Sequence, residues 1–200
     1  MNPLLPISSR RIRSALAAAA AILLPAACTS GADAPTAAEA PAAVEHLSPT
    51  HGSARGGALT AAQLQGVARV RRATTALHDI AAARDAGYTE QFPAGCAQST
   101  SGVQGFHYLN PGLVDATVEL LRPELVMYEP QPDGSLQLIG VDYVVPFDAW
   151  TAPEPPTLLG MPFGRNEPLG VWALHIWAWR PNPNGMFAMW NPKASCAYAQ

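Results

Sequence analysis

Apolar side chains recur every three or four positions just after residue 60, which is the spacing of a helix with one buried face. The positions are Leu64, Val67, Val70, Thr74, Leu77 and Ala81. Thr60 and Gln63 stand ahead of this run in the arrangement of a capping box, and Gly87 suits the C-terminal end. The pattern therefore predicts one long helix from about residue 60 to residue 87.

Beyond Cys96 the pattern changes to short apolar runs separated by proline and glycine, which is typical of strands. The expected strands are Val103–Leu109, Leu125–Glu129, Ser135–Val145 and Gly170–Trp179, with a short return strand at Met186–Trp190. Residues 130–134 predict a hairpin turn, 111–121 a helical turn or two, and 146–168 an irregular loop.

A long helix followed by mainly antiparallel strands predicts the α+β class, with one N-terminal helix packed on a curved sheet in a single domain. Cystatin- and NTF2-like rolls are an analogy for this shape and carry no function. Alternation places Asp142 on the face of Leu136, Leu138 and Val144. It gives His175 the same face as Val171, Ala173, Trp177 and Trp179.

The chain opens with three arginines and an uninterrupted apolar run, Ala15–Leu24. This run is shorter than the roughly 20 residues that cross a bilayer, and small residues follow it, so residues 1–27 are expected to be a secretory signal peptide. The stretch LLPAAC ends at Cys28 and resembles the lipobox of bacterial lipoproteins. The resemblance implies lipidation of Cys28 and a membrane-anchored protein of the cell envelope. Ordinary cleavage, giving a freely secreted or periplasmic protein, is the alternative.

Residues 28–57 are rich in alanine, proline and threonine and predict a disordered linker, which leaves residues 58–200 as the domain. Without residues 1–27, nine basic and fifteen acidic residues remain. This acidic balance, with a single lysine, lacks the basic footprint of a nucleic-acid-binding protein. Nothing in the sequence indicates the oligomeric state.

An odd number of cysteines in an exported protein needs an explanation, and the chain has three. Lipidation of Cys28 would leave Cys96 and Cys196 to form a disulfide, which an oxidising compartment favours. The alternative, a reactive thiol, needs a nearby base and exposure.

Three polar residues interrupt apolar runs: His107 in FHYLN, Asp142 in LIGVDYVV and His175 in VWALHIWAW. Two histidines and a carboxylate are the ingredients of a metal site or of an acid–base pair. They are equally the ingredients of a satisfied structural cluster, because their positions are scattered along the chain. Copper, with Met161, Met186 or Met189 as soft ligands, is a further reading of the metal site.

Tryptophans gather near the C-terminus, at Trp172, Trp177, Trp179 and Trp190. Such a cluster forms either a pocket for a small apolar or aromatic ligand or part of the core. The GxSxG, HExxH, P-loop and GxGxxG motifs are absent, which weighs against the familiar enzyme classes. The hypotheses are therefore a membrane-tethered ligand-binding domain, a metal-binding protein or metal-assisted hydrolase, and a structural module of the cell envelope.

The segment LHIWAWRPNPNGMFAMWNPKASC resembles the ending of a group of exported bacterial proteins. The upstream pieces GFHYLNP, RPELVMYEP and VDYVVP resemble the same group, so the similarity covers most of the chain after Cys96. The resemblance implies export and a single domain, and it assigns no activity, substrate or cofactor.

Overall fold

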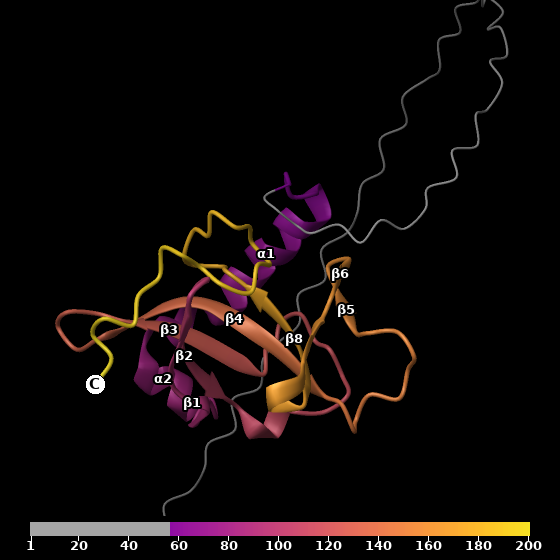
Figure 1. Ribbon diagram of the computed structural model, residues 1–200, viewed down its shortest axis with the longest axis horizontal. Coiled ribbons are helices and arrows are strands. Elements are labelled where there is room, and N and C mark those ends of the chain that lie inside the picture. The colour runs from indigo at the N-terminus through magenta and orange to yellow at the C-terminus, as the bar shows by residue number, and fades with distance from the viewer. Residues whose placement is uncertain (1–56) are drawn as a thin grey trace, which may run out of the picture. The chain divides into compact units, whose positions relative to one another are not determined.

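A helical segment lies on one face of a six-stranded antiparallel sheet (Figure 1). The computed structural model describes residues 57–200, and within this range the α+β class and the single domain are confirmed. The expected signal peptide (1–27), Cys28 and the linker as far as residue 56 lie outside the described residues. Among residues 57–200, no helix combines the length and the apolarity that a membrane crossing requires.

The helical segment is broken, so the prediction of one long helix is wrong. Its pieces are α1 (Ala61–Thr74), the 3₁₀ turn η1 (Thr75–His78) and α2 (Ile80–Asp85). The capping box of Thr60 and Gln63 at the start of α1 is present as predicted. The buried stripe begins later than expected, because Leu64 is 56% exposed whereas Val67 and Val70 are buried.

Contacts outside the helix account for the break. The carbonyl of Leu77 accepts a hydrogen bond from the buried Tyr128 hydroxyl of the sheet, which competes with continued helical pairing. Asp79 then adopts an extended backbone conformation, and its carboxylate accepts a hydrogen bond from the Ala81 N–H at the start of α2. Asp79 therefore acts as an N-cap in the middle of the apolar periodicity.

Neighbouring strands of the sheet are antiparallel throughout, in the order β1-β2-β3-β4-β8-β7. The strands are β1 (Glu90–Ser99), β2 (Gly102–Leu109), β3 (Leu125–Pro130), β4 (Leu136–Pro146), β7 (Gly164–Asn166) and β8 (Val171–Ile176). The predicted ranges of β2, β3 and β4 agree within one residue at each end. The sequence did not predict β1, because few of its residues are apolar.

The connections hold short elements. They are η2 (Pro111–Leu113), the hairpin of β5 (Thr157–Leu158) with β6 (Met161–Pro162), and η3 (Glu167–Leu169). Met186–Trp190 forms turns instead of the predicted strand. The Met186 carbonyl accepts one hydrogen bond from the Trp177 N–H just beyond the end of β8, and no strand pairing follows among residues 186–190.

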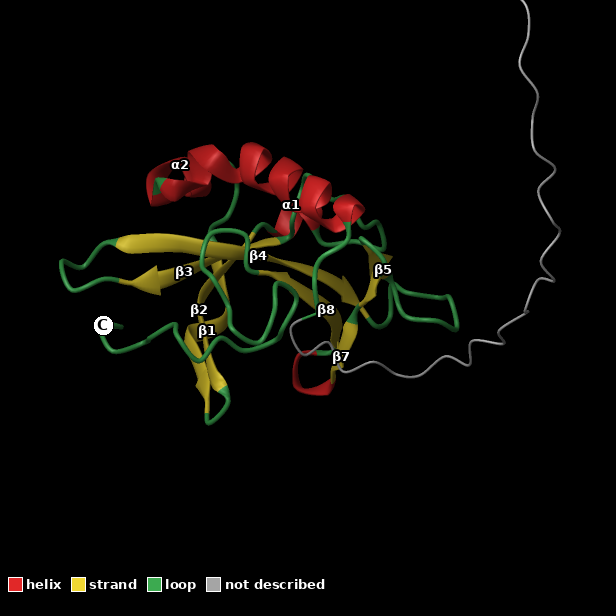
Figure 2. Ribbon diagram, turned by 90° about the horizontal axis from the view of Figure 1, so that it is seen from above, coloured by secondary structure: helices red, strands yellow, loops and turns green. Residues whose placement is uncertain are grey.

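The two faces of the sheet have separate cores. The helices cover one face of the sheet (Figure 2). This face carries the large cluster, which includes Val67 and Val70 from α1 and Tyr128, Tyr143 and Leu174 from the strands. The opposite face carries two smaller clusters. One contains Leu125, Val144, Val171 and Ala173, and the other contains Met127, Ile139, Trp177 and Ala194. We call this second face the concave face, because the sheet curls around it.

Two glycines allow close approach between strands where the sheet curls. A Cβ at Gly105, whose φ is 85°, would collide with the Tyr128 carbonyl of β3. A Cβ at Gly140 would lie 2.6 Å from the Ile176 carbonyl oxygen of β8. The register shifts beside both glycines, as in β-bulges, which bend strands and increase their twist.

The shift in β4 corrects one prediction. Met127 pairs with Gly140 and Tyr128 pairs with Leu138, so Ile139 is an extra residue in β4. Leu138 consequently packs in the helix-side core, while Asp142 shares the concave face with Val144. The strict alternation that gave Asp142 and Leu138 one face fails at this irregularity.

The chain after β8 folds back to the start of the sheet and is tied there. Asn191 pairs with Val103, and Glu129 accepts hydrogen bonds from the Arg180 side chain and the Ser195 N–H. The sulfur atoms of Cys96 and Cys196 lie at disulfide-bonding distance, with their Cα atoms 5.9 Å apart. The cysteine count predicts the same pairing.

Candidate metal centre

Three strands contribute one polar residue each to the middle of the concave face. Asp142 of β4 and His175 of β8 are direct cross-strand partners, whereas His107 lies on β2. Strands β3 and β4 separate β2 from β8. Three strand spacings of about 4.8 Å would hold β2 and β8 about 14 Å apart in a flat sheet. The curl of the sheet therefore brings the two histidine side chains together.

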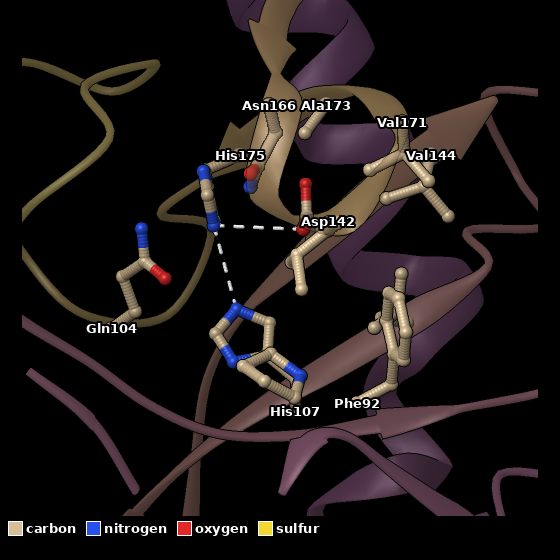
Figure 3. Close-up of a pocket in the computed structure, with 12 residues that line it drawn as sticks. Phe92, Gln104, His107, Asp142, Val144, Asn166, Val171, Ala173 and His175 are labelled. Atoms are coloured by element: carbon tan, nitrogen blue, oxygen red, sulfur yellow. Dashed lines mark hydrogen bonds and ion pairs between the residues drawn. The ribbon is translucent and has the colours of Figure 1, made fainter. Parts of the chain in front are cut away.

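The three side chains meet at contact distance (Figure 3). The Nε2 atoms of His107 and His175 are 3.4 Å apart, and His175 Nε2 is 3.5 Å from Asp142 Oδ2. Each residue offers one potential ligand atom, and these atoms all lie within 4.8 Å of one another. The side chains are buried, with 2% of His107 and 5% of Asp142 and of His175 exposed.

These separations suit shared coordination of one ion. Two ligand atoms held about 2.0–2.1 Å from a tetrahedral zinc ion lie about 3.3–3.4 Å apart. The two measured separations, 3.4 and 3.5 Å, are close to that value. They are longer than the usual 2.7–3.2 Å or so of a direct hydrogen bond from nitrogen. The ligand atoms of the third pair, His107 and Asp142, lie within 4.8 Å of each other. Two of the three separations therefore match ligands that share one ion.

Burial sets the charge of the three groups. It lowers the pKa of His107 and of His175 to about 4, because the imidazolium form loses its hydration. It raises the pKa of Asp142 to about 6 for the same reason, and the nearby His107 ring partly opposes that rise. At neutral pH both rings are therefore neutral and the carboxyl is mostly ionised. These are the forms that bind metal ions.

Two buried polar atoms of the cluster, Asp142 Oδ1 and His107 Nδ1, make no hydrogen bond of good geometry with the described residues. The backbone of Tyr143 and Leu174 nevertheless lies near the Asp142 carboxylate, and that of Gly105 lies near His107. The carboxylate also lacks a cationic neighbour, because the described residues that line the adjoining cavity include no lysine or arginine. An unbalanced buried charge is costly, since burial of an ion normally requires a paired charge or a bound metal.

A small cavity adjoins the three residues. Its volume is about 20 Å³, which is enough for one water molecule or one metal ion. Every strand of the six-stranded sheet contributes to its wall, together with Leu169 of η3. Apolar residues form most of that wall, namely Phe92, Pro93, Leu125, Val144, Leu169, Val171 and Ala173.

Sequence reasoning missed two polar residues of the wall, Gln104 and Asn166. Gln104 is the extra residue of the register shift in β2, so alternation would not place it beside His107. Asn166 ends the edge strand β7, which the sequence read as part of an irregular loop. No local signal in the sequence marks either residue.

The predicted tryptophan pocket and methionine ligands lie elsewhere. Trp177 is buried on the concave face beside His175. Trp172 packs on the helix side, as alternation along β8 places it. Trp179 also packs there, because β8 ends at Ile176 and alternation stops. Trp190 is half-buried in the C-terminal segment, and none of the described residues that line the small cavity is a tryptophan.

The predicted soft ligands are also separated from the histidines. Met161 packs in the helix-side core and Met189 is 42% exposed. Met186 packs against both the helix-side cluster and the cluster that contains Trp177. None of the three methionines lines the small cavity, so the copper reading gains no ligand from them.

No family model matches this chain, and neither do the curated proteins or the solved structures. The assignment of the site therefore depends on its own geometry.

Proposed function

We propose that the domain binds a divalent transition-metal ion through His107, Asp142 and His175. The observation that carries this proposal is the convergence of two imidazole nitrogens and a carboxylate oxygen at 3.4 and 3.5 Å in a buried cluster. Two nitrogens and one oxygen form a ligand set that suits zinc and non-haem iron.

A purely structural polar cluster is the competing explanation. Such a cluster is stabilising when its buried groups are all hydrogen-bonded. Here Asp142 Oδ1 and His107 Nδ1 make no hydrogen bond of good geometry with the described residues. The carboxylate is also ionised at neutral pH beside two neutral rings. A metal ion would neutralise that charge and bind both facing nitrogens. In the structural reading one ring donates a hydrogen bond to the other at 3.4 Å, and the charge of the carboxylate stays unbalanced.

The two other functions considered from the sequence have less support. The tryptophans Trp172, Trp177 and Trp179 are packed against other side chains, so they form part of the cores more than a ligand pocket.

Export, lipidation of Cys28 and residence in the cell envelope stay proposals, supported by the arginines and apolar run of residues 1–27. The comparison with cystatin- and NTF2-like rolls is likewise a hypothesis about shape alone.

Metal analysis of the purified full chain tests the proposal. After saturation with zinc and removal of excess metal, we expect about one equivalent per chain. Asp142→Asn and His175→Ala should lose most of it, because each removes one of three ligands. His78→Ala is the matched control, since His78 is exposed and packs on Trp179 away from the site. Retention by His175→Ala, or equal loss from His78→Ala, would contradict the proposal.

A further inference from the structure

The cavity beside the three residues has a polar side and an apolar side. Figure 3 shows Gln104 beside the histidine pair and Asn166 close to His175, while Phe92, Val144 and Val171 lie beyond Asp142. The two amides come from different strands, β2 and β7. The wall of the cavity thus combines two uncharged amide side chains with the three potential metal ligands.

The Gln104 side chain is held in place. It is 9% exposed, and its Nε2 donates a hydrogen bond to the Met189 carbonyl at 3.1 Å. This bond fixes the amide plane and leaves the side-chain oxygen for another donor. Asn166 is half-buried at the end of β7, and its side chain forms no capping hydrogen bond with the turn η3 that follows. Both amides therefore have capacity to bind a group that the chain itself does not supply.

The number of protein ligands points to the same conclusion. Structural zinc sites use four protein ligands, whereas catalytic sites use three and leave a position for water or substrate. The described residues supply three ligands here. The ion itself would fill most of the cavity of about 20 Å³, which is partly open to solvent, so a further ligand must be small and enter from the open side.

We propose that the ion keeps one exchangeable coordination position for a small monodentate ligand, and that Gln104 and Asn166 position that ligand. This inference rests on the proposed metal site. In the resting protein the ligand is water, and small anions such as azide compete for the same position. The apolar wall around Val144 and Val171 excludes other water, which strengthens the polar contacts within the site.

Cobalt(II) in place of zinc provides a spectroscopic test, because its visible absorption reports the number and kind of its ligands. The full chain is loaded with cobalt and titrated with azide. We expect one cobalt per chain and a saturable spectral change on addition of azide. Asn166→Ala should weaken azide binding about tenfold, because it removes one hydrogen-bond donor. Gln104→Leu should not weaken azide binding, because the free Gln104 oxygen accepts a hydrogen bond from bound water and azide has no hydrogen to donate. Cobalt stoichiometry should stay at one in both variants. Gln137→Leu, an exposed residue of β4, is the matched control and should bind azide as the wild type does.

The outcomes separate the two proposals. Failure of the wild type to bind cobalt would overturn the metal site itself. Cobalt binding without any spectral response to azide would overturn the exchangeable position and leave the metal site standing. Unchanged azide affinity in Asn166→Ala would overturn the positioning role. This variant alters only an edge strand, so it tests the role even if Gln104→Leu fails to fold.

Discussion

The Nε2 atoms of His107 and His175 lie 3.4 Å apart although the two residues sit on strands separated by two others. Side chains meet across such a distance only where the sheet curls strongly. The curl depends on close approaches at Gly105 and Gly140, where a Cβ would collide with a neighbouring strand. The features that bend the sheet therefore also assemble the three potential metal ligands.

Asp142→Asn should change stability in opposite directions with and without metal. In the metal-free protein at pH 7.5 we expect a gain of about 1–3 kcal/mol, because the variant removes a buried carboxyl whose pKa is raised to about 6. With saturating zinc the wild type should be the more stable protein, because the variant binds the ion weakly. Denaturant unfolding with and without zinc measures both values. A variant less stable than the wild type under both conditions would indicate a structural role for Asp142.

Zinc affinity should fall as pH is lowered, because the three ligand groups take up protons in a specific order. Above about pH 7 all three groups are in their ligand forms. Asp142, with a pKa of about 6, takes up a proton first, and the histidines follow near pH 4. The dissociation constant should therefore rise about tenfold per pH unit just below pH 6, as one proton competes with the metal. Competition with a chelator from pH 8 to 5 checks this. A steep loss already between pH 8 and 7 would contradict it.

The buried carboxyl of Glu124 should make the folded protein less stable as pH rises. Burial raises its pKa from 4.5 to about 8, so between these values the unfolded chain has lost a proton that the folded chain keeps. The free energy of unfolding should then fall by up to about 1.4 kcal/mol per pH unit. Above about pH 7.2 the two histidines and Asp142 contribute little. The unfolded histidines, with a pKa of 6.5, have by then lost most of their protons, and Asp142, with a folded pKa of about 6, is ionised in both states.

Glu124→Gln should remove this dependence in the metal-free protein. Unfolding by urea at pH 7.2, 7.6 and 8 should give nearly constant stability for the variant and a decline for the wild type. Glu119→Gln is the control, because Glu119 is exposed and pairs with Arg122 at the surface. Equal slopes for the Glu124→Gln variant and the wild type would refute the prediction.

Loss of the disulfide should lower stability and weaken the metal site together. Cys96 and Cys196 are 100 positions apart, and a bridge that closes a loop of this size contributes about 4–5 kcal/mol in the chain-entropy model. Cys96 also lies on β1, the strand whose Phe92 and Pro93 line the cavity. The double variant Cys96→Ser/Cys196→Ser should therefore unfold at lower denaturant and bind zinc less tightly. An unfolding midpoint equal to that of the oxidised wild type would show that the bridge does not stabilise the fold.

Local sequence pattern predicted the strands better than it predicted their faces. Apolar runs bounded by proline and glycine located β2, β3 and β4, because burial of a strand depends mainly on neighbouring residues. The extra residue Ile139 then turned Leu138 away from the face of Asp142, and nothing local signals such a shift. The prediction of one long helix failed for a similar reason, because the hydroxyl that binds the Leu77 carbonyl belongs to Tyr128, 51 positions away.

The sequence singled out the three potential metal ligands as unusual residues, but it did not show that they lie together in one site. A polar residue inside an apolar run singled out His107, Asp142 and His175, since burial of such groups is costly without partners. Their convergence depends on the order and curl of the strands, which the spacing of 68 residues between the histidines does not reveal. Gln104 and Asn166 join the site only through a register shift and an edge strand.

The most direct test is a crystal structure of the zinc-loaded full chain with anomalous diffraction at the zinc absorption edge. We expect one strong peak about 2.0–2.2 Å from the Nε2 atoms of His107 and His175 and from a carboxylate oxygen of Asp142. Crystals that contain zinc but show no peak there, with the two imidazoles hydrogen-bonded directly to each other, would contradict the metal site.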